Sequence, residues 1–176
     1  RISEAIHDMD LSHVILLQGD EPLIKPSYIE KIVKEIKNNP YDNAWNVTGP
    51  IASSKQIDKN SFVKCAVSRN NEILYCFRRG PSHQSFEIQS QYIRKILGII
   101  AYRKECLVEL VKMQPTLIES VESIEQMRII EGGFRIKSVP VNESLPSVNE
   151  PSEVNSVIEQ LMNDKEQKRL FRETTG

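Results

Sequence analysis

Apolar residues near the start of the chain predict a strand followed by a helix. Residues 13–17 form a short continuous run, which is typical of a strand buried on both faces of a parallel sheet. The polar segment 18–22 ends this run. Ser27 and Glu30 then have the spacing of a capping box, and apolar residues recur at helical spacing until Asn38. This order of elements is typical of an α/β fold.

The pattern over the middle of the chain predicts a hairpin, a loop and a further strand. Two apolar segments, 62–67 and 73–77, are separated by a short polar turn and are therefore expected to pair. The segment 79–91 is dominated by polar residues, which favours a loop. A strand is expected at 97–102, where Gly98 marks a position at which another part of the chain packs closely.

Helical patterns follow in the second half of the chain. A helix is expected around residues 106–111. Thr116 and Glu119 have the spacing of a second capping box, and they precede one longer helix that we expect to end at Gly132. A strand is predicted over residues 136–141.

The end of the chain is expected to contain one last helix and a tail. Pro151 suits the first turn of a helix whose apolar residues continue to Leu161. The segment 163–176 is charged, and we expect it to fray. Residues 1–162 are then expected to form a single domain, because no linker or repeat divides them.

Composition constrains the partners and the location of the protein. Its 23 basic and 24 acidic residues are well mixed, so the net charge of −1 gives no electrostatic reason to expect nucleic-acid binding. No apolar run has the length of a bilayer span, and no secretory signal is visible. The sequence therefore predicts a cytoplasmic protein without a membrane partner.

Cysteine and histidine residues do not suggest a metal centre. Cys65, Cys76 and Cys106 lie in apolar stretches and lack the close pairing of a zinc site. We expect them to be buried thiols in a reducing compartment. The histidines are scattered, so no metal-binding role is expected for them.

Five segments of the chain, taken in order, match the motifs of one family. They are Gln18-Gly19-Asp20-Glu21-Pro22; Asn60, Val63 and Lys64; Leu74, Tyr75 and Arg78; Gly98, Ile99, Ala101, Tyr102 and Arg103; and Glu119, Glu122, Glu125, Gln126 and Arg128. Together they resemble the 3-deoxy-manno-octulosonate cytidylyltransferase family, also called CMP-Kdo synthetases. The resemblance covers the chain from Arg1 to about Leu161.

This resemblance implies a fold and a reaction. The fold is a Rossmann-like, three-layer nucleotidyltransferase fold with a mostly parallel sheet and a β-hairpin excursion. The reaction joins a sugar acid to the α-phosphorus of CTP, releases pyrophosphate and uses Mg²⁺. Family members form homodimers. They also begin with a strand and a glycine-rich phosphate-binding loop, which the resemblance places before Arg1, so the chain is expected to be a divergent member or a fragment.

The loop after the first strand carries the main candidate site. Asp20 lies where that strand ends, and ligands of open α/β sheets collect at such ends. By the resemblance, Asp20 is a catalytic residue and a metal ligand, while Gln18 and Gly19 contact substrate. The alternative for Asp20 is a turn residue that caps its own backbone.

Other candidates lie further along the chain. Arg78 is expected to pair with a substrate carboxylate through its planar guanidinium. Glu125 and Gln126 match a polar pair of the family's sugar pocket; the alternative is the solvated face of an amphipathic helix.

Three positions depart from the family pattern. Asn149 stands where the family has its second metal-binding aspartate, so it is either a weaker metal ligand or a helix cap, and Glu150 beside it could supply the missing carboxylate. Ile96 and Ile100 stand where the family has a histidine and a tyrosine that contact the sugar acid. These departures leave open the alternative of a non-catalytic relative that keeps the fold for binding or assembly.

Overall fold

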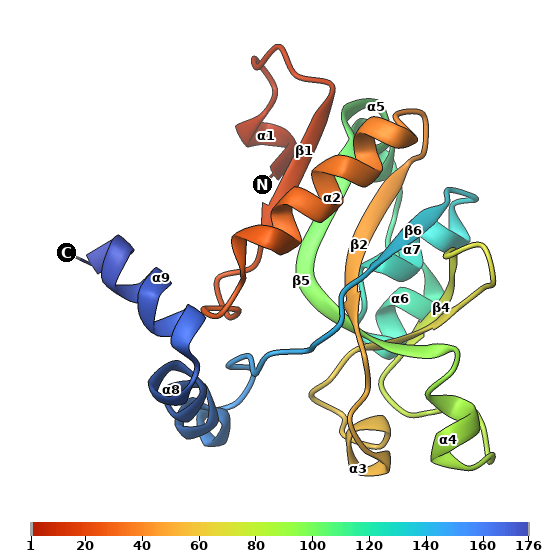
Figure 1. The fold of residues 1–176 in the computed structure, drawn as a ribbon. Coiled ribbons are helices and arrows are strands. Elements are labelled where there is room, and N and C mark those ends of the chain that lie inside the picture. The colour runs from red at the N-terminus through yellow and green to blue at the C-terminus, as the bar shows by residue number, and fades with distance from the viewer. Residues whose placement is uncertain (1, 176) are drawn as a thin grey trace.

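A six-stranded sheet forms the centre of the computed structural model, which describes residues 2–175 (Figure 1). The strands are β1 (His13–Leu17), β2 (Ala44–Gly49), β3 (Lys64–Val67), β4 (Ile73–Phe77), β5 (Ile93–Arg103) and β6 (Ile136–Pro140). The helices are α1 (Ile2–Ala5), α2 (Pro26–Asn38), α3 (Ser54–Ile57), α4 (Phe86–Gln89), α5 (Lys104–Lys112), α6 (Leu117–Glu122), α7 (Gln126–Glu131), α8 (Val154–Asn163) and α9 (Lys165–Thr175). A short 3₁₀ helix at Pro151–Glu153 precedes α8.

The sheet is mixed and mostly antiparallel. The strand order is β4-β3-β5-β2-β6, and β1 pairs with β5 beyond the end of β3. Only the pair β2–β6 is parallel among the described strands. The prediction of a mostly parallel sheet is therefore wrong, because β5 runs opposite to each of its three neighbours.

Strand β1 is where the sequence predicts it, but its environment differs from the prediction. It is paired only with β5 within the described chain, and its residues are partly exposed rather than buried on both faces. The exposed fraction of Leu17 reaches 45%. An apolar run thus correctly predicts a strand here, although not a central one.

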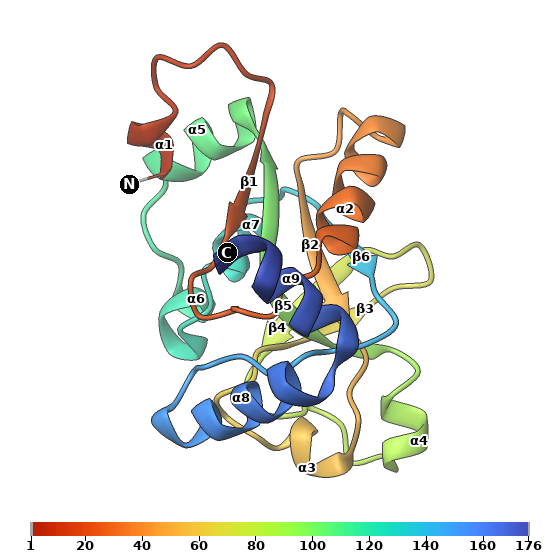
Figure 2. The same ribbon diagram turned by 60° about the vertical axis from the view of Figure 1, so that its left-hand side comes forward.

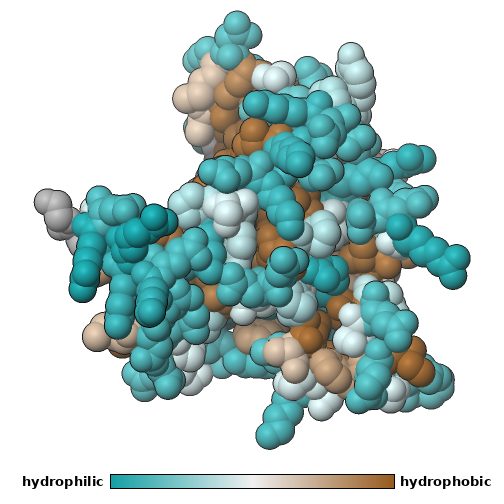
Figure 3. Space-filling model, viewed as in Figure 1, coloured by the Kyte–Doolittle hydropathy of each residue, from teal (hydrophilic) through white to brown (hydrophobic). Residues whose placement is uncertain are grey.

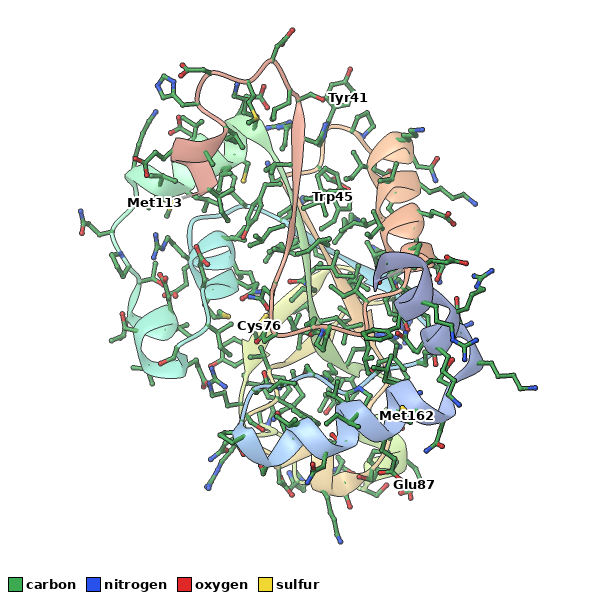
Figure 4. All side chains as sticks on the ribbon, turned by 90° about the vertical axis from the view of Figure 1, so that its left-hand side faces the viewer. Tyr41, Trp45, Cys76, Glu87, Met113 and Met162 are labelled. Atoms are coloured by element: carbon green, nitrogen blue, oxygen red, sulfur yellow. The ribbon has the colours of Figure 1, made fainter. Side chains whose placement is uncertain are left out.

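Helices cover both faces of the sheet (Figure 2). On one face, Tyr28, Ile32 and Ile36 of α2 pack with Trp45, which is fully buried. Figure 4 labels Trp45 beside α2. The other face packs against α5 and α7, through residues such as Leu107, Leu110, Met127 and Ile129. Each such buried side chain contributes about 1.5–3 kcal/mol of hydrophobic stabilisation. The helices therefore form an outer layer on either side of the sheet, as the resemblance implies.

Strand β2 has no counterpart among the predicted elements. All its residues are buried, including the polar Asn46 and Thr48. The Asn46 amide nitrogen donates to the Leu97 and Ile99 carbonyl oxygens at 2.9 and 3.1 Å. Hydrogen bonds of this kind allow a polar side chain to be buried without a large free-energy cost. The strand was not predicted because Asn46 and Thr48 interrupt the apolar pattern that would have indicated it.

Two helix boundaries differ from the sequence predictions. Helix α2 begins at Pro26 after Lys25, so the capping box at Ser27 and Glu30 is wrong. The Thr116–Glu119 capping box is confirmed. The single long helix predicted after it is instead two helices, α6 and α7, because Ser123 adopts a left-handed conformation with φ of 54°.

The charged C-terminal segment forms helix α9 instead of fraying. Its Gln167 is buried and donates to the Leu23 carbonyl oxygen at 2.9 Å. Lys25, before α2, forms ion pairs with Glu143 and with Glu166 of α9. Figure 3 shows the hydrophilic outer surface of this helix. These contacts attach α9 to the domain.

The three cysteines are buried and free, as expected. Burial raises the pKa of the Cys65 thiol to about 12, so this side chain stays neutral. Within residues 2–175, no helix combines the length and the apolar character that crossing a membrane requires.

Candidate active site

A cavity opens where β1 and β3 separate along one edge of β5. Strand β1 pairs with residues 99–103 of β5, and β3 pairs with residues 93–95. Between them, residues 96–98 face a cavity of about 570 Å³. A volume of this size is typical of a site for a small-molecule ligand or cofactor.

Glu21 fixes the loop at the point where β1 leaves the sheet. Its carboxylate accepts a hydrogen bond from the Gly98 backbone N–H at 2.8 Å, and Gln18 N–H donates to the Gly98 carbonyl oxygen at 2.8 Å. A Cβ atom at Gly98 would lie 2.7–2.8 Å from side-chain atoms of Gln18 and Glu21. The prediction that Gly98 marks close packing is therefore confirmed. Burial raises the pKa of the Glu21 carboxyl above its usual value.

The two candidate metal ligands lie on adjacent loops. The Asp20 carbonyl oxygen accepts a hydrogen bond from Val148 N–H at 2.8 Å, which brings Asp20 next to the segment containing Asn149. Both residues line the cavity. The Asn149 amide nitrogen donates to Ser147 Oγ and Glu153 Oε2. Its Oδ1 is consequently the atom that remains available to a cation.

Glu153 organises this second loop, although the sequence patterns did not single it out. Its carboxylate accepts hydrogen bonds from the Asn149 and Glu150 backbone N–H groups at 2.8 and 3.2 Å, and it pairs with Lys59 at 2.5 Å. Against the opposing effect of burial, these partners lower the pKa of Glu153 to about 2. The residue that caps the following 3₁₀ helix is Glu150, so the alternative that Asn149 is the cap is wrong.

Arg78 forms part of the opposite wall of the cavity. Its guanidinium donates to the carbonyl oxygens of Asn60, Glu122 and Ser123 at 2.9–3.2 Å. These neutral acceptors fix the side chain but do not cancel its charge. Arg78 therefore places a guanidinium group in the cavity lining.

The left-handed Ser123 directs the start of α7 towards the same cavity. Glu125 and Gln126 both line it, with Glu125 exposed and Gln126 partly buried. Gln126 donates to Asn46 Oδ1 at 3.1 Å, which anchors it to the sheet. Glu125 and Gln126 therefore do not lie on a helix face that is solvated throughout, which was the alternative for this pair.

The positions that depart from the family pattern also lie here. Ile96 and Ile100 are buried and line the cavity, where they offer only apolar contacts. Gly19 is exposed, and of the predicted site residues it alone is absent from the described lining. The structure also places Lys95 in the lining, a residue that the motif comparison overlooked.

The oxygen atoms of Asp20 and Asn149 suit part of a magnesium site. Mg²⁺ is typically held by one or two protein carboxylates together with substrate phosphates. Over the described range, no cluster of three or more acidic, histidine or cysteine side chains could hold a metal on its own. The residues therefore fit an ion whose coordination a bound phosphate completes.

The sheet, its two helical layers and this cavity define an α/β domain of the nucleotidyltransferase type. A solved CMP:2-keto-3-deoxy-manno-octonic acid synthetase, in complex with CTP, is similar in structure with a TM-score of 0.79 and 26% sequence identity. That match covers 98% of this chain and 67% of the other. The cytidylyltransferase family model matches residues 1–137, and the chain belongs to this family.

Curated relatives support the same assignment. The chain is 34% identical to the 3-deoxy-manno-octulosonate cytidylyltransferase of Chlorobium limicola, covering 100% of this chain and 68% of the relative. It is 32% identical to that of Chlorobium phaeobacteroides, covering 98% and 66%. The chain thus spans about two thirds of the length of these relatives. The fold is also similar to an inositol-1-phosphate CTP transferase from T. maritima, with a TM-score of 0.60 and 16% identity over 92% of this chain and 59% of the other.

Proposed function

We propose that the protein is a CTP-dependent nucleotidyltransferase that activates a sugar acid to its CMP derivative with release of pyrophosphate. The observation that carries this proposal is the meeting of Asp20, Arg78, Gln126 and Asn149 around one cavity in a cytidylyltransferase fold. The cavity offers oxygen ligands on one side and a cation with amide groups on the other. Such a site can bind a metal–phosphate complex and an acidic acceptor together.

Each substrate has a side of the cavity in this proposal. Asp20 and Asn149 hold Mg²⁺, which when bound offsets the negative charge of the triphosphate. Arg78 and Gln126 orient the sugar acid, with Glu125 available to its hydroxyl groups. Ile96 and Ile100 favour an acceptor that presents a less polar face than Kdo does. A homodimer and a cytoplasmic location remain predictions.

Pyrophosphate release tests the function directly. With CTP, Mg²⁺ and a panel of sugar acids, we expect release that requires both the metal and one of the acids. Titration calorimetry with CTP provides a readout independent of turnover. Absence of CTP binding in the presence of Mg²⁺ would contradict the proposal.

A second candidate is a non-catalytic relative that uses the fold for binding or assembly, and Asn149 is the observation that favours it. In Asn149→Asp, a carboxylate replaces the amide that lies 3.1 Å from Glu153 Oε2, so like charges become neighbours. If the site is enzymatic, this variant should melt at a lower temperature without Mg²⁺, recover with it, and bind CTP about tenfold more tightly.

The matched control for this variant is Asn155→Asp, which adds the same charge on the exposed side of α8. Calorimetry and thermal unfolding with and without Mg²⁺ provide the measurements. If magnesium changes neither the melting temperature nor the CTP affinity of Asn149→Asp, the site has lost its metal function and the second candidate is preferred.

A further inference from the structure

Lys95 is a buried cation in the lining of the candidate active site. Its exposed fraction is 4%. It extends from β5 towards Leu145 and Ser147, two residues before Asn149, and it lines both the main cavity and a smaller one of about 220 Å³ next to it. A buried ammonium group is costly unless it has charged or strongly hydrogen-bonding partners.

The described partners of Lys95 are weak. Its Nζ lies 3.5 Å from the Leu145 carbonyl oxygen and from Ser147 Oγ, at the limit of hydrogen bonding. It also lies 4.3 Å from the centre of the Phe62 ring. None of the described carboxylates forms an ion pair with it. Burial accordingly lowers the pKa of Lys95, although nearby acidic side chains oppose this effect.

Lys59 provides an instructive contrast. Its Nζ lies 4.4 Å from the centre of the same Phe62 ring, but it pairs with the Glu153 carboxylate at 2.5 Å. Its charge is thus already compensated within the protein. Lys95 differs because no described carboxylate contacts its ammonium group directly, although the Glu21, Glu153 and Asp20 carboxylates act on it from a longer distance.

The cavity lining contains more acidic than basic side chains, so each basic side chain matters for binding an anion. Four acidic side chains line it, and Arg78 and Lys95 are the two basic side chains among the described lining residues. Arg78 lies on the wall near α7, whereas Lys95 lies on the side of Ser147 and Asn149. An anionic substrate bound between these loops would find Lys95 as its cationic partner.

We propose that Lys95 Nζ binds an anionic oxygen of a substrate at the Asp20–Asn149 side of the cavity. This inference rests on the proposed function and adds a specific binding residue to it. The oxygen belongs either to a phosphate of CTP or to the carboxylate of the sugar acid. The location beside the proposed metal ligands favours the phosphate.

Lys95→Met tests this role because it keeps the length of the side chain and removes the charge. We expect its affinity for CTP and for inorganic pyrophosphate to fall by about tenfold or more, while its affinity for cytidine stays unchanged. Its melting temperature should change little, because the loss of the longer-range attraction to Glu21, Glu153 and Asp20 is offset by no longer burying an ammonium group that lacks a direct ion pair. Lys55→Met, on the exposed surface of α3, is the matched control and should change neither the affinity for CTP and pyrophosphate nor the melting temperature.

The outcomes separate the two possible sources of the oxygen and the two proposals. A loss confined to CTP and pyrophosphate assigns the phosphate, and a loss confined to the sugar acid that supports pyrophosphate release assigns the acceptor carboxylate. Unchanged binding of every anion by Lys95→Met, or an equal loss for cytidine together with a lower melting temperature, overturns the role of Lys95 alone. If the unsubstituted chain binds none of these anions, the proposed function fails as well.

Discussion

Replacing Asp20 with asparagine is expected to remove nearly all magnesium-dependent CTP binding. The change replaces the only charged member of the proposed metal pair with a neutral amide, and a neutral oxygen attracts Mg²⁺ far less than a carboxylate does. We expect the CTP affinity measured with Mg²⁺ to fall by about a hundredfold, which corresponds to about 2.7 kcal/mol. Pyrophosphate release should fall at least as far.

The fold should tolerate this substitution. Asp20 is attached to the neighbouring loop through its backbone carbonyl oxygen, which accepts from Val148 and is unchanged in the variant. Its side chain is exposed, so the melting temperature should be close to that of the unsubstituted protein. Asp10→Asn, on the exposed segment before β1, controls for the loss of one negative charge. An Asp20→Asn protein that binds CTP and Mg²⁺ normally would show that Asp20 is only a turn residue.

Replacing Glu153 with glutamine is expected to give the largest loss of stability. The carboxylate accepts from two backbone N–H groups and the Asn149 amide, and it pairs with Lys59. Hydrogen bonds to a charged group are stronger than those to a neutral amide. Because Lys59 is partly exposed and therefore screened by solvent, we expect a loss of about 2 kcal/mol at pH 7.

The pH dependence of this loss provides an independent check. The pKa of Glu153 is about 2 in the folded protein, against an ordinary value of 4.5. Between these values the unfolded chain binds the proton more readily, so the unfolding free energy falls as the pH decreases. The stabilisation is complete above about pH 4.5 and is lost towards pH 2.

Urea unfolding at several pH values measures this effect. The difference between the unsubstituted protein and Glu153→Gln should be large at pH 7 and should shrink steadily below pH 4.5. Glu159→Gln, an exposed position on α8, should show no such difference. A Glu153→Gln protein whose stability deficit is the same at low and neutral pH would contradict the assigned role of this carboxylate.

Local sequence patterns predicted individual elements better than their arrangement. The hairpin of β3 and β4, strand β6 and the helix after Pro151 all occur where short-range spacing places them. The direction of β5 does not follow from its own residues, because parallel and antiparallel pairing depend on the connections between strands. Strand β2 could not be identified from an apolar pattern, since Asn46 and Thr48 are compatible with the sheet only through partners distant in sequence.

The residues of the candidate site were likewise predicted only in part. Asp20, Arg78, Gln126 and Asn149 were found from motifs, and the structure brings them around one cavity. Glu153 and Lys95 were missed because their importance depends on burial and on neighbours from other segments. A lysine in a strand and a glutamate after a proline have no distinctive spacing. Their unusual environments become visible only when the charges around them are located in space.

Strand β5 joins β1 and β3, the strands on either side of the cavity, through a single continuous backbone. Its 11 residues pair with β1 at one end and with β3 at the other, so neither of these two strands can separate from the sheet without breaking hydrogen bonds to β5. Such an arrangement couples the site to the global unfolding of the domain. Ligand binding should therefore shift one cooperative melting transition as a whole, and hydrogen exchange at residues 96–98 should slow together with that of the sheet.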